Sequence, residues 1–131
     1  MSVSILIITH STIGRALLDA VISVMEQCPL HTQLLPVALD GDPDSLQREA
    51  QNLIDSLDQG DGVLVITDMY GSTPSNIACR LSNDSVKVVT GINLPMLVRI
   101  MNYPQLELKQ LVEKAVSAGR EGVIHCKGYE Q

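Results

Sequence analysis

Two polar side chains, His10 and Asp68, are the clearest candidates for chemistry, because each directly follows an apolar run. The first run, VSILIIT, covers residues 3 to 9, and the second, VLVIT, covers residues 63 to 67. A neutral imidazole is a nucleophile at the ring nitrogen that lacks a proton. A carboxylate that accepts a hydrogen bond from the other nitrogen fixes the tautomer and stabilises positive charge as it forms on the ring. The two residues therefore have the chemistry of a nucleophile and its orienting carboxylate.

The segment DMYGSTPSN, which begins at the aspartate, has the composition of an anion-binding turn. Gly71 permits a tight turn, and Ser72 and Thr73 supply hydroxyl groups. Pro74 at the start of a helix leaves the preceding main-chain amides pointing outward, which favours an anion. This arrangement fits a histidine that accepts a phosphoryl group whose oxygens are held by the amides and hydroxyls of residues 71 to 76.

The same residues also have ordinary structural interpretations. A histidine at a strand end is often an exposed loop residue, and an aspartate after a strand often caps a turn. His10 in that case only lines a crevice, and the protein is a non-catalytic regulatory module that binds an anion or a partner protein. His31 and His125 have no comparable context, and we interpret both as structural or surface residues.

Hydrophobic periodicity predicts strands that alternate with helices along the whole chain. The predicted strands cover residues 3–9, 34–39, 63–67, 86–90 and 121–126. The first predicted helix covers residues 12–27, and the second is capped by Asp42 with Pro43 at its first position. Two short helices start at Pro74 and Pro95. The last helix has an apolar stripe of Leu108, Leu111, Val112 and Ala115, and Gly119 is predicted to end it.

Such alternation predicts an α/β fold, with a doubly wound, mostly parallel sheet and helices on both faces. Pro36 removes a ladder donor from the second strand and so restricts that strand to an edge. We therefore expect the strand order 2-1-3-4, with a short C-terminal edge strand. Ligands in such sheets bind at the carboxyl ends of the strands beside the reversal of chain direction, here between strands one and three. His10 and Asp68 are expected to meet there.

Length and composition limit the function classes. The 131 residues predict a single domain, and the 45% hydrophobic content is ordinary for a globular protein. No apolar run is long enough to span a bilayer and no basic leader precedes a cleavage site, which predicts a cytoplasmic protein without membrane insertion. A net charge of −6 without a Lys/Arg cluster argues against nucleic-acid binding. Cys28, Cys79 and Cys126 are far apart and predict free thiols rather than a disulfide framework or a metal site.

Four motifs in order resemble a known family over essentially the whole chain. They are the strand that closes on Thr9 and His10, DMYGSTPSN, TGINLPML at 90–97 and AGREGV at 118–123. Together they are similar to the enzyme IIA domain of the mannose-type (mannose/fructose/sorbose) phosphoenolpyruvate-dependent sugar phosphotransferase system, or PTS. In that family the phosphocarrier protein HPr phosphorylates the histidine that closes the first strand. The histidine passes the group to a IIB domain, which phosphorylates the incoming sugar at the membrane permease.

The resemblance implies that residues 1–131 form one IIA domain in which His10 is phosphorylated, Asp68 orients it, and Ser72 and Thr73 lie near the phosphoryl oxygens. No metal or other cofactor is expected, and HPr and a separate IIB domain are the implied partners. Such a protein serves sugar uptake or acts as a regulatory readout of phosphoenolpyruvate supply.

The resemblance further implies a homodimer whose C-terminal strand exchanges between subunits, although Val123 and Ile124 fit equally a strand that completes the sheet within one subunit. The family commonly has glycine where this chain has Ser11 and Ser72, and each serine costs backbone freedom beside the phosphate.

Overall fold

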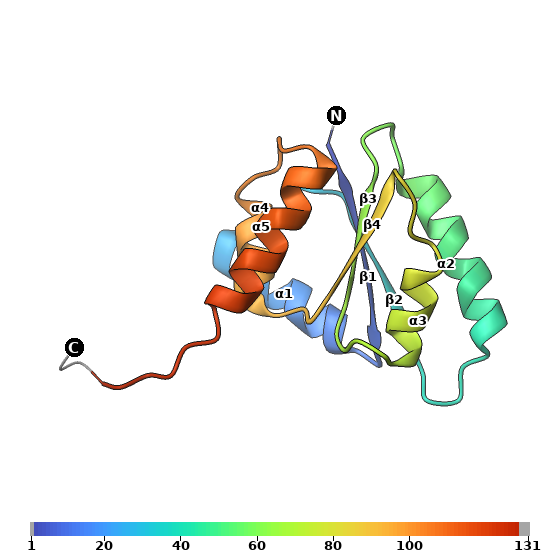
Figure 1. The fold of residues 1–131 in the computed structure, drawn as a ribbon, viewed down its shortest axis with the longest axis horizontal. Helices are drawn as coiled ribbons and strands as arrows, with labels where there is room; N and C mark the ends of the chain where they lie inside the picture. The colour runs from blue at the N-terminus through green and yellow to red at the C-terminus, as the bar shows by residue number, and fades with distance from the viewer. Residues whose placement is uncertain (1, 129–131) are drawn as a thin grey trace.

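Four parallel strands form one sheet with the order β2-β1-β3-β4 in the computed structural model, which describes residues 2–128 (Figure 1). The strands are β1 (Ser4–His10), β2 (Thr32–Val37), β3 (Val63–Thr67) and β4 (Val86–Thr90). The expected α/β class and the order of these four strands are confirmed. The predicted domain bounds also include residue 1 and residues 129–131, which lie outside the described residues.

Within residues 2–128, five helices cover the two faces of the sheet. They are α1 (Ile13–Met25), α2 (Pro43–Leu57), α3 (Thr73–Cys79), α4 (Leu94–Met101) and α5 (Leu108–Glu121). Helices α1, α4 and α5 pack on one face, and α2 and α3 pack on the other (Figure 1). This two-sided cover explains why β1 and β3, the central strands, are buried at almost every position and each contain a continuous apolar run.

Local sequence signals explain several element boundaries. The Asp42 carboxylate accepts a hydrogen bond from the Ser45 N–H at 3.1 Å, and Pro43 is the first residue of α2, as predicted. Pro36 lies in β2, an edge strand, where its missing N–H removes no hydrogen bond from the interior of the sheet. The sequence therefore predicts both of these positions from physical causes that act within a few residues.

Gly119 does not end the last helix, contrary to the prediction. Helix α5 continues through Gly119 to Glu121. A Cβ at Gly119 would lie 2.9 Å from Cε of Met96, so the absent side chain lets α5 approach α4 closely. The Asn93 side-chain amide also donates a hydrogen bond to the Gly119 carbonyl at 3.1 Å. This glycine serves helix packing rather than helix termination.

The predicted C-terminal edge strand over residues 121–126 is not formed in this chain. Glu121 belongs to α5, and residues 123–128 have no regular secondary structure and extend away from the body (Figure 1). Val123 and Ile124 are 78% and 77% exposed. A strand needs a ladder partner, and residues 123–128 pair with none of the strands of the same chain. Completion of the sheet within one subunit is therefore excluded for this conformation.

The described residues carry neither a spanning helix nor a metal-ligand cluster. Between residues 2 and 128, none of the helices combines the length and the apolar character needed to cross a membrane. In the same range, no three His, Cys, Asp or Glu side chains are placed to hold a metal ion. Cys28, Cys79 and Cys126 are exposed free thiols.

Candidate functional site

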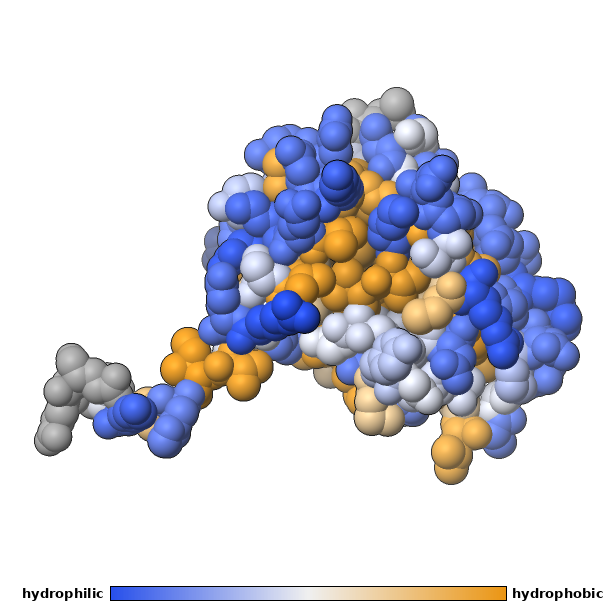
Figure 2. Space-filling model, in the orientation of Figure 1, coloured by the Kyte–Doolittle hydropathy of each residue, from blue (hydrophilic) through white to orange (hydrophobic). Residues whose placement is uncertain are grey.

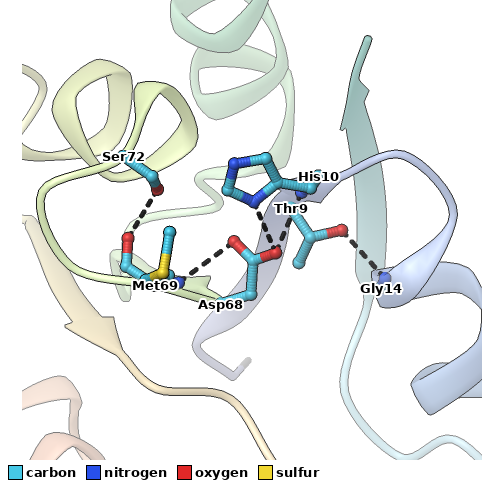
Figure 3. A network of polar contacts seen from close by, with 6 residues as sticks. All are labelled: Thr9, His10, Gly14, Asp68, Met69 and Ser72. Atoms are coloured by element: carbon cyan, nitrogen blue, oxygen red, sulfur yellow. Dashed lines mark hydrogen bonds and ion pairs between the residues drawn. The ribbon is translucent and has the colours of Figure 1, made fainter. Parts of the chain in front are cut away.

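The imidazole of His10 contacts the carboxylate of Asp68 at the carboxyl end of the two central strands (Figure 3). Strands β1 and β3 run parallel with Ile8 opposite Thr67, so their last residues lie at the same edge of the sheet. Nδ1 of His10 lies 2.8 Å from Oδ2 of Asp68. The same oxygen accepts the main-chain N–H of His10 at 3.1 Å. One carboxylate oxygen therefore holds both the backbone and the ring of the histidine.

The hydrogen bonds around Asp68 set its charge. Burial alone would raise the pKa of the Asp68 carboxyl, but hydrogen bonds from the His10 side chain and main chain, together with a main-chain bond at Asp68 itself and the charge of His10, lower the pKa below its ordinary value. The group is therefore an ionised carboxylate at neutral pH, and an ionised carboxylate only accepts hydrogen bonds. Nδ1 of His10 must carry the proton in this contact, which leaves Nε2 of the neutral ring with the free lone pair.

The two side chains differ in their access to solvent. The Asp68 side chain is 12% exposed, whereas the His10 side chain is 41% exposed. The other oxygen of the carboxylate accepts the Met69 N–H at 3.1 Å, so both carboxylate oxygens have partners. The carboxylate is thus a fixed, largely enclosed acceptor, and the histidine is open to a second molecule.

The turn between β3 and α3 has its own hydrogen bonds (Figure 3). Gly71 has φ +82°, a conformation that favours glycine, and its N–H donates to Oγ of Ser75 at 3.3 Å. The Ser72 hydroxyl donates to the Met69 carbonyl at 2.5 Å. The proton of the Ser72 hydroxyl, which we expected to face the phosphoryl oxygens, is therefore used inside the turn in this conformation.

Thr73 offers the open donors of this turn. It is the first residue of α3 and is exposed, and its main-chain N–H has no hydrogen-bond partner among residues 2–128. The predicted site residues are therefore arranged in two groups: His10 and Asp68 are in direct contact, while Gly71, Ser72 and Thr73 form the turn that follows Asp68.

The sequence does not reveal the roles of two buried hydroxyl groups beside the site, although Ser75 lies in the segment 71 to 76 whose hydroxyls we expected to hold phosphoryl oxygens. The Thr9 hydroxyl accepts the Gly14 N–H at 2.8 Å, and the Ser75 hydroxyl accepts the Gly71 N–H at 3.3 Å. The two residues are 2% and 1% exposed. A polar residue inside an otherwise apolar, buried segment is the signal that identifies such positions.

Exposed apolar side chains occur in the loops at this end of the sheet. Met69 and Tyr70, which follow Asp68 directly, are 58% and 79% exposed. Ile13, at the start of α1, is 44% exposed, and Leu39, in the loop before α2, is fully exposed. Large exposed apolar side chains near a reactive group are typical of a surface that another protein covers.

Comparison with known proteins gives one consistent family. The family model described as "PTS system fructose IIA component" matches residues 4–116. The mannose-specific EIIAB component of the PTS from Escherichia coli (strain K12) is 39% identical over 77 residues. That alignment covers 54% of this chain and only 23% of the relative, so the chain matches less than a quarter of the relative's length.

Solved structures agree in fold over nearly the whole chain. The mannose/sorbose specific IIA subunit of the phosphotransferase system from Enterococcus faecalis superposes with a TM-score of 0.89 at 17% identity, covering 100% of this chain and 99% of that chain. A PTS IIA protein associated with the fucose utilization operon of Streptococcus pneumoniae superposes with a TM-score of 0.77 at 25% identity, covering 95% and 96%. Because the family model spans most of the sequence and these folds agree with it, the chain belongs to the family of PTS IIA components of the fructose and mannose type.

Proposed function

We propose that this protein is a phosphoryl carrier of a sugar PTS, in which His10 takes a phosphoryl group from phospho-HPr and passes it to a separate IIB domain. The observation that carries the proposal is the 2.8 Å contact between Nδ1 of His10 and the Asp68 carboxylate. This contact leaves Nε2 as the ring nitrogen with the free lone pair, on a side chain that is 41% exposed.

The transfer step needs little beyond position and charge. The Nε2 lone pair forms a bond to phosphorus while the bond from phosphorus to the donor group breaks, and the electron pair of that bond leaves with the donor. Nδ1 keeps its proton throughout. The ring becomes positively charged as the new bond forms, and the ionised Asp68 carboxylate 2.8 Å away stabilises that charge.

We assign the phosphoryl oxygens to the turn formed by Gly71, Ser72 and Thr73. The unpaired Thr73 N–H and the exposed Thr73 hydroxyl are the donors that support this assignment. Ser72 contributes by holding the Met69 carbonyl and so shaping the turn. A donor aimed at the negative charge of the transferred group lowers the barrier without moving any protein group.

We further propose that the donor and the acceptor are proteins. The exposed Met69 and Tyr70 beside Asp68 support docking of a protein surface better than binding of a small molecule alone. We treat residues 1–131 as one IIA domain, on which HPr and a IIB domain would dock in turn. We also propose that the relay operates in the cytoplasm, which the membership of the PTS IIA family supports.

A homodimer through the C-terminal segment completes the proposal. Strand β4 is an edge strand, and a hollow of about 510 Å³ lies beside it, lined by valines of β4 and α5 together with polar residues and Val123 of the same chain. Figure 2 shows apolar surface in the region where Figure 1 draws β4. Val123 and Ile124, exposed in the single chain, have the residue types that would pair at such an edge in a second copy.

Phosphoryl labelling tests the function. The protein is incubated with labelled phosphoenolpyruvate, enzyme I and HPr, and we expect an acid-labile phosphate on the wild-type protein. His10→Ala should abolish the label while the fold is kept, and His31→Ala is the matched control that should keep the label. A His10→Ala variant that still takes up label contradicts the proposal. A wild-type protein that stays unlabelled would favour the alternative of a non-catalytic binding module.

A further inference from the structure

The hydroxyl of Thr9 joins the end of β1 to the first turn of α1. Side chains alternate along a strand, so Thr9 points to the face covered by α1, and His10, the next residue, points to the opposite face. Oγ1 of Thr9 accepts the main-chain N–H of Gly14 at 2.8 Å (Figure 3). Thr9 is 2% exposed and Gly14 is buried, so water does not compete for this bond.

The bond replaces a missing helix cap. Thr12 is the N-cap residue of α1, and its side chain makes no capping hydrogen bond. The first N–H groups of a helix have no partner inside the helix and need one from elsewhere. Thr9 supplies that partner from the strand, so one contact satisfies a helix donor and fixes the helix to the strand.

Gly14 is matched to this contact. A Cβ at Gly14 would lie 3.0 Å from Oγ1 of Thr9 and 2.7 Å from Cγ2 of Ile7. A larger residue at position 14 would therefore require Ile7, Thr9 or the start of α1 to shift, which would disturb the hydrogen bond. The hydroxyl and the glycine therefore act as one clamp, which we call the Thr9–Gly14 clamp.

The Thr9–Gly14 clamp closes a turn that contains a strained residue. Ser11 has φ +47°, in the left-handed region that non-glycine residues seldom adopt, and its N–H donates to the Val37 carbonyl at 2.9 Å. Such a conformation persists only where the surrounding contacts hold it. A cavity of about 160 Å³, lined in part by Thr9, Ser11 and Thr12, borders the turn. The packing on that side therefore leaves room for the turn to relax once the clamp is lost.

His10 lies inside this closed turn. Its main-chain N–H and its Nδ1 both bond to the same Asp68 oxygen, so the ring reaches the carboxylate only when the backbone at His10 has the correct orientation. A shift of about 1 Å in such a reacting group is enough to reduce a rate about a hundredfold. From these contacts we propose that Thr9 is a positioning residue, whose hydroxyl fixes the β1–α1 turn and thereby the tautomer and direction of the His10 ring. The inference rests on the proposed function for its effect on rate, but its effect on the ring is independent of phosphoryl transfer.

Thr9→Val tests the proposal, because valine keeps the shape of threonine and removes the hydroxyl. The ¹⁵N chemical shifts of the His10 ring are measured in the full chain at a pH high enough to keep the ring unprotonated. In the wild type we expect one fixed neutral tautomer with the proton on Nδ1, and in Thr9→Val we expect shifts averaged between the two tautomers. Phosphoryl uptake from phospho-HPr should slow at least about tenfold in Thr9→Val and stay within about threefold of wild type in Thr9→Ser, which restores the hydroxyl.

Ser4→Ala is the matched control. Ser4 lies at the other end of β1, is 2% exposed, and donates a buried hydrogen bond to the Leu57 carbonyl at 2.8 Å. The control therefore loses a buried hydroxyl bond on the same strand and should leave the His10 shifts and the uptake rate unchanged. Gly14→Ala is a second variant that keeps the hydroxyl and disturbs the clamp from the helix side, so it should change the His10 shifts in the same direction as Thr9→Val.

The proposal would be overturned if the His10 shifts in both Thr9→Val and Gly14→Ala were the same as in the wild type and phosphoryl uptake were no slower than in Ser4→Ala. Should Thr9→Val not fold, the shifts in Gly14→Ala decide in its place, with Thr9→Ser as the variant expected to behave as wild type. If the wild-type protein takes up no phosphoryl group, the proposed function fails, while the ¹⁵N shifts still decide the role of Thr9.

Discussion

The β1–α1 turn and the β3–α3 turn lie at the same end of the sheet and are held in opposite ways. In the first, a hydroxyl on the strand, at Thr9, accepts an N–H from the helix. In the second, a hydroxyl on the helix, at Ser75, accepts the N–H of Gly71 in the turn. The left-handed residue is Ser11 in the first turn and Gly71 in the second. One turn therefore holds a strained residue by a buried contact, and the other adopts its shape without strain.

This difference matches two different tasks. The proposed nucleophile, His10, must be held in one direction, and the buried clamp and its two bonds to Asp68 support that role. A turn that receives a phosphoryl group must leave donors open, and Thr73 does so at the end of a glycine-containing turn. We therefore attribute the orientation of the nucleophile to the β1–α1 turn and the binding of the transferred group to the β3–α3 turn.

The largest effect is expected where the two turns meet, at Asp68. Asp68→Asn keeps the size of the side chain but removes the negative charge that, in the proposed mechanism, stabilises the charged ring. We expect the rate of phosphoryl uptake by the full chain to fall by about a hundredfold or more. Rapid-quench labelling with phospho-HPr measures this rate. Asp19→Asn, a change at an exposed position of α1, is the control that should keep the wild-type rate.

Removal of the Thr9 or the Ser75 hydroxyl shows how much each turn contributes to the free energy of unfolding. Thr9→Val leaves the Gly14 N–H without a partner in a buried position, which should lower the free energy of unfolding by about 1–3 kcal/mol. Ser75→Ala should cost less, about 0.5–1.5 kcal/mol, because Gly71 is exposed and its N–H can bond to water. Urea unfolding of both variants gives the order directly. A larger loss in Ser75→Ala than in Thr9→Val would reverse the comparison.

Exchange of the left-handed residues tests the strain. Ser11→Gly should raise the free energy of unfolding by about 0.5–1 kcal/mol, because glycine adopts φ +47° without a side-chain clash. Gly71→Ala should lower the free energy of unfolding by about 1 kcal/mol, because alanine is strained at φ +82°. No neighbouring atom lies within 4 Å of the added Cβ, so this backbone strain is the only expected cost. Thermal or urea unfolding measures both. Equal and small effects at the two positions would show that the two turns do not differ in strain.

The smallest effect concerns pH. The pKa of Asp68 is lower in the folded protein than its ordinary value of 3.8. The contacts of the ionised carboxylate therefore stabilise the fold fully at any pH above 3.8, and this stabilisation is lost as the pH falls through the pKa of the folded protein. Wild type should therefore be more stable than Asp68→Asn at pH 7, and the difference should shrink below pH 4. Urea midpoints of both proteins over this range supply the test. A difference that grows as the pH falls would mean that the folded pKa is raised instead.

Much of the fold follows from signals that act over a few residues. Pro36 places its strand at an edge, and Asp42 with Pro43 begins α2. The apolar character of β1 and β3 puts both strands in the centre of the sheet, and from that order the meeting of His10 and Asp68 follows by topology.

The features that the sequence does not reveal depend on tertiary contacts. Gly119 suggests a helix end, but the approach of Met96 explains the glycine and the helix continues. Residues 121–126 have strand composition, yet strand formation needs pairing with a sheet edge, and in the single chain this segment pairs with neither the β2 edge nor the β4 edge. The same holds at the site: the Thr9–Gly14 bond joins residues five apart through a turn whose shape depends on Ser11, and no periodicity encodes it.

The position of the phosphoryl group on the ring tests the account most directly. The full chain is labelled with ¹⁵N at the His10 ring and phosphorylated with phosphoenolpyruvate, enzyme I and HPr, and the ¹⁵N–³¹P coupling identifies the bonded nitrogen. Because Asp68 holds Nδ1, the account predicts phosphorus on Nε2 and a retained Nδ1 proton. Phosphorus on Nδ1, or on any residue other than His10, would contradict it.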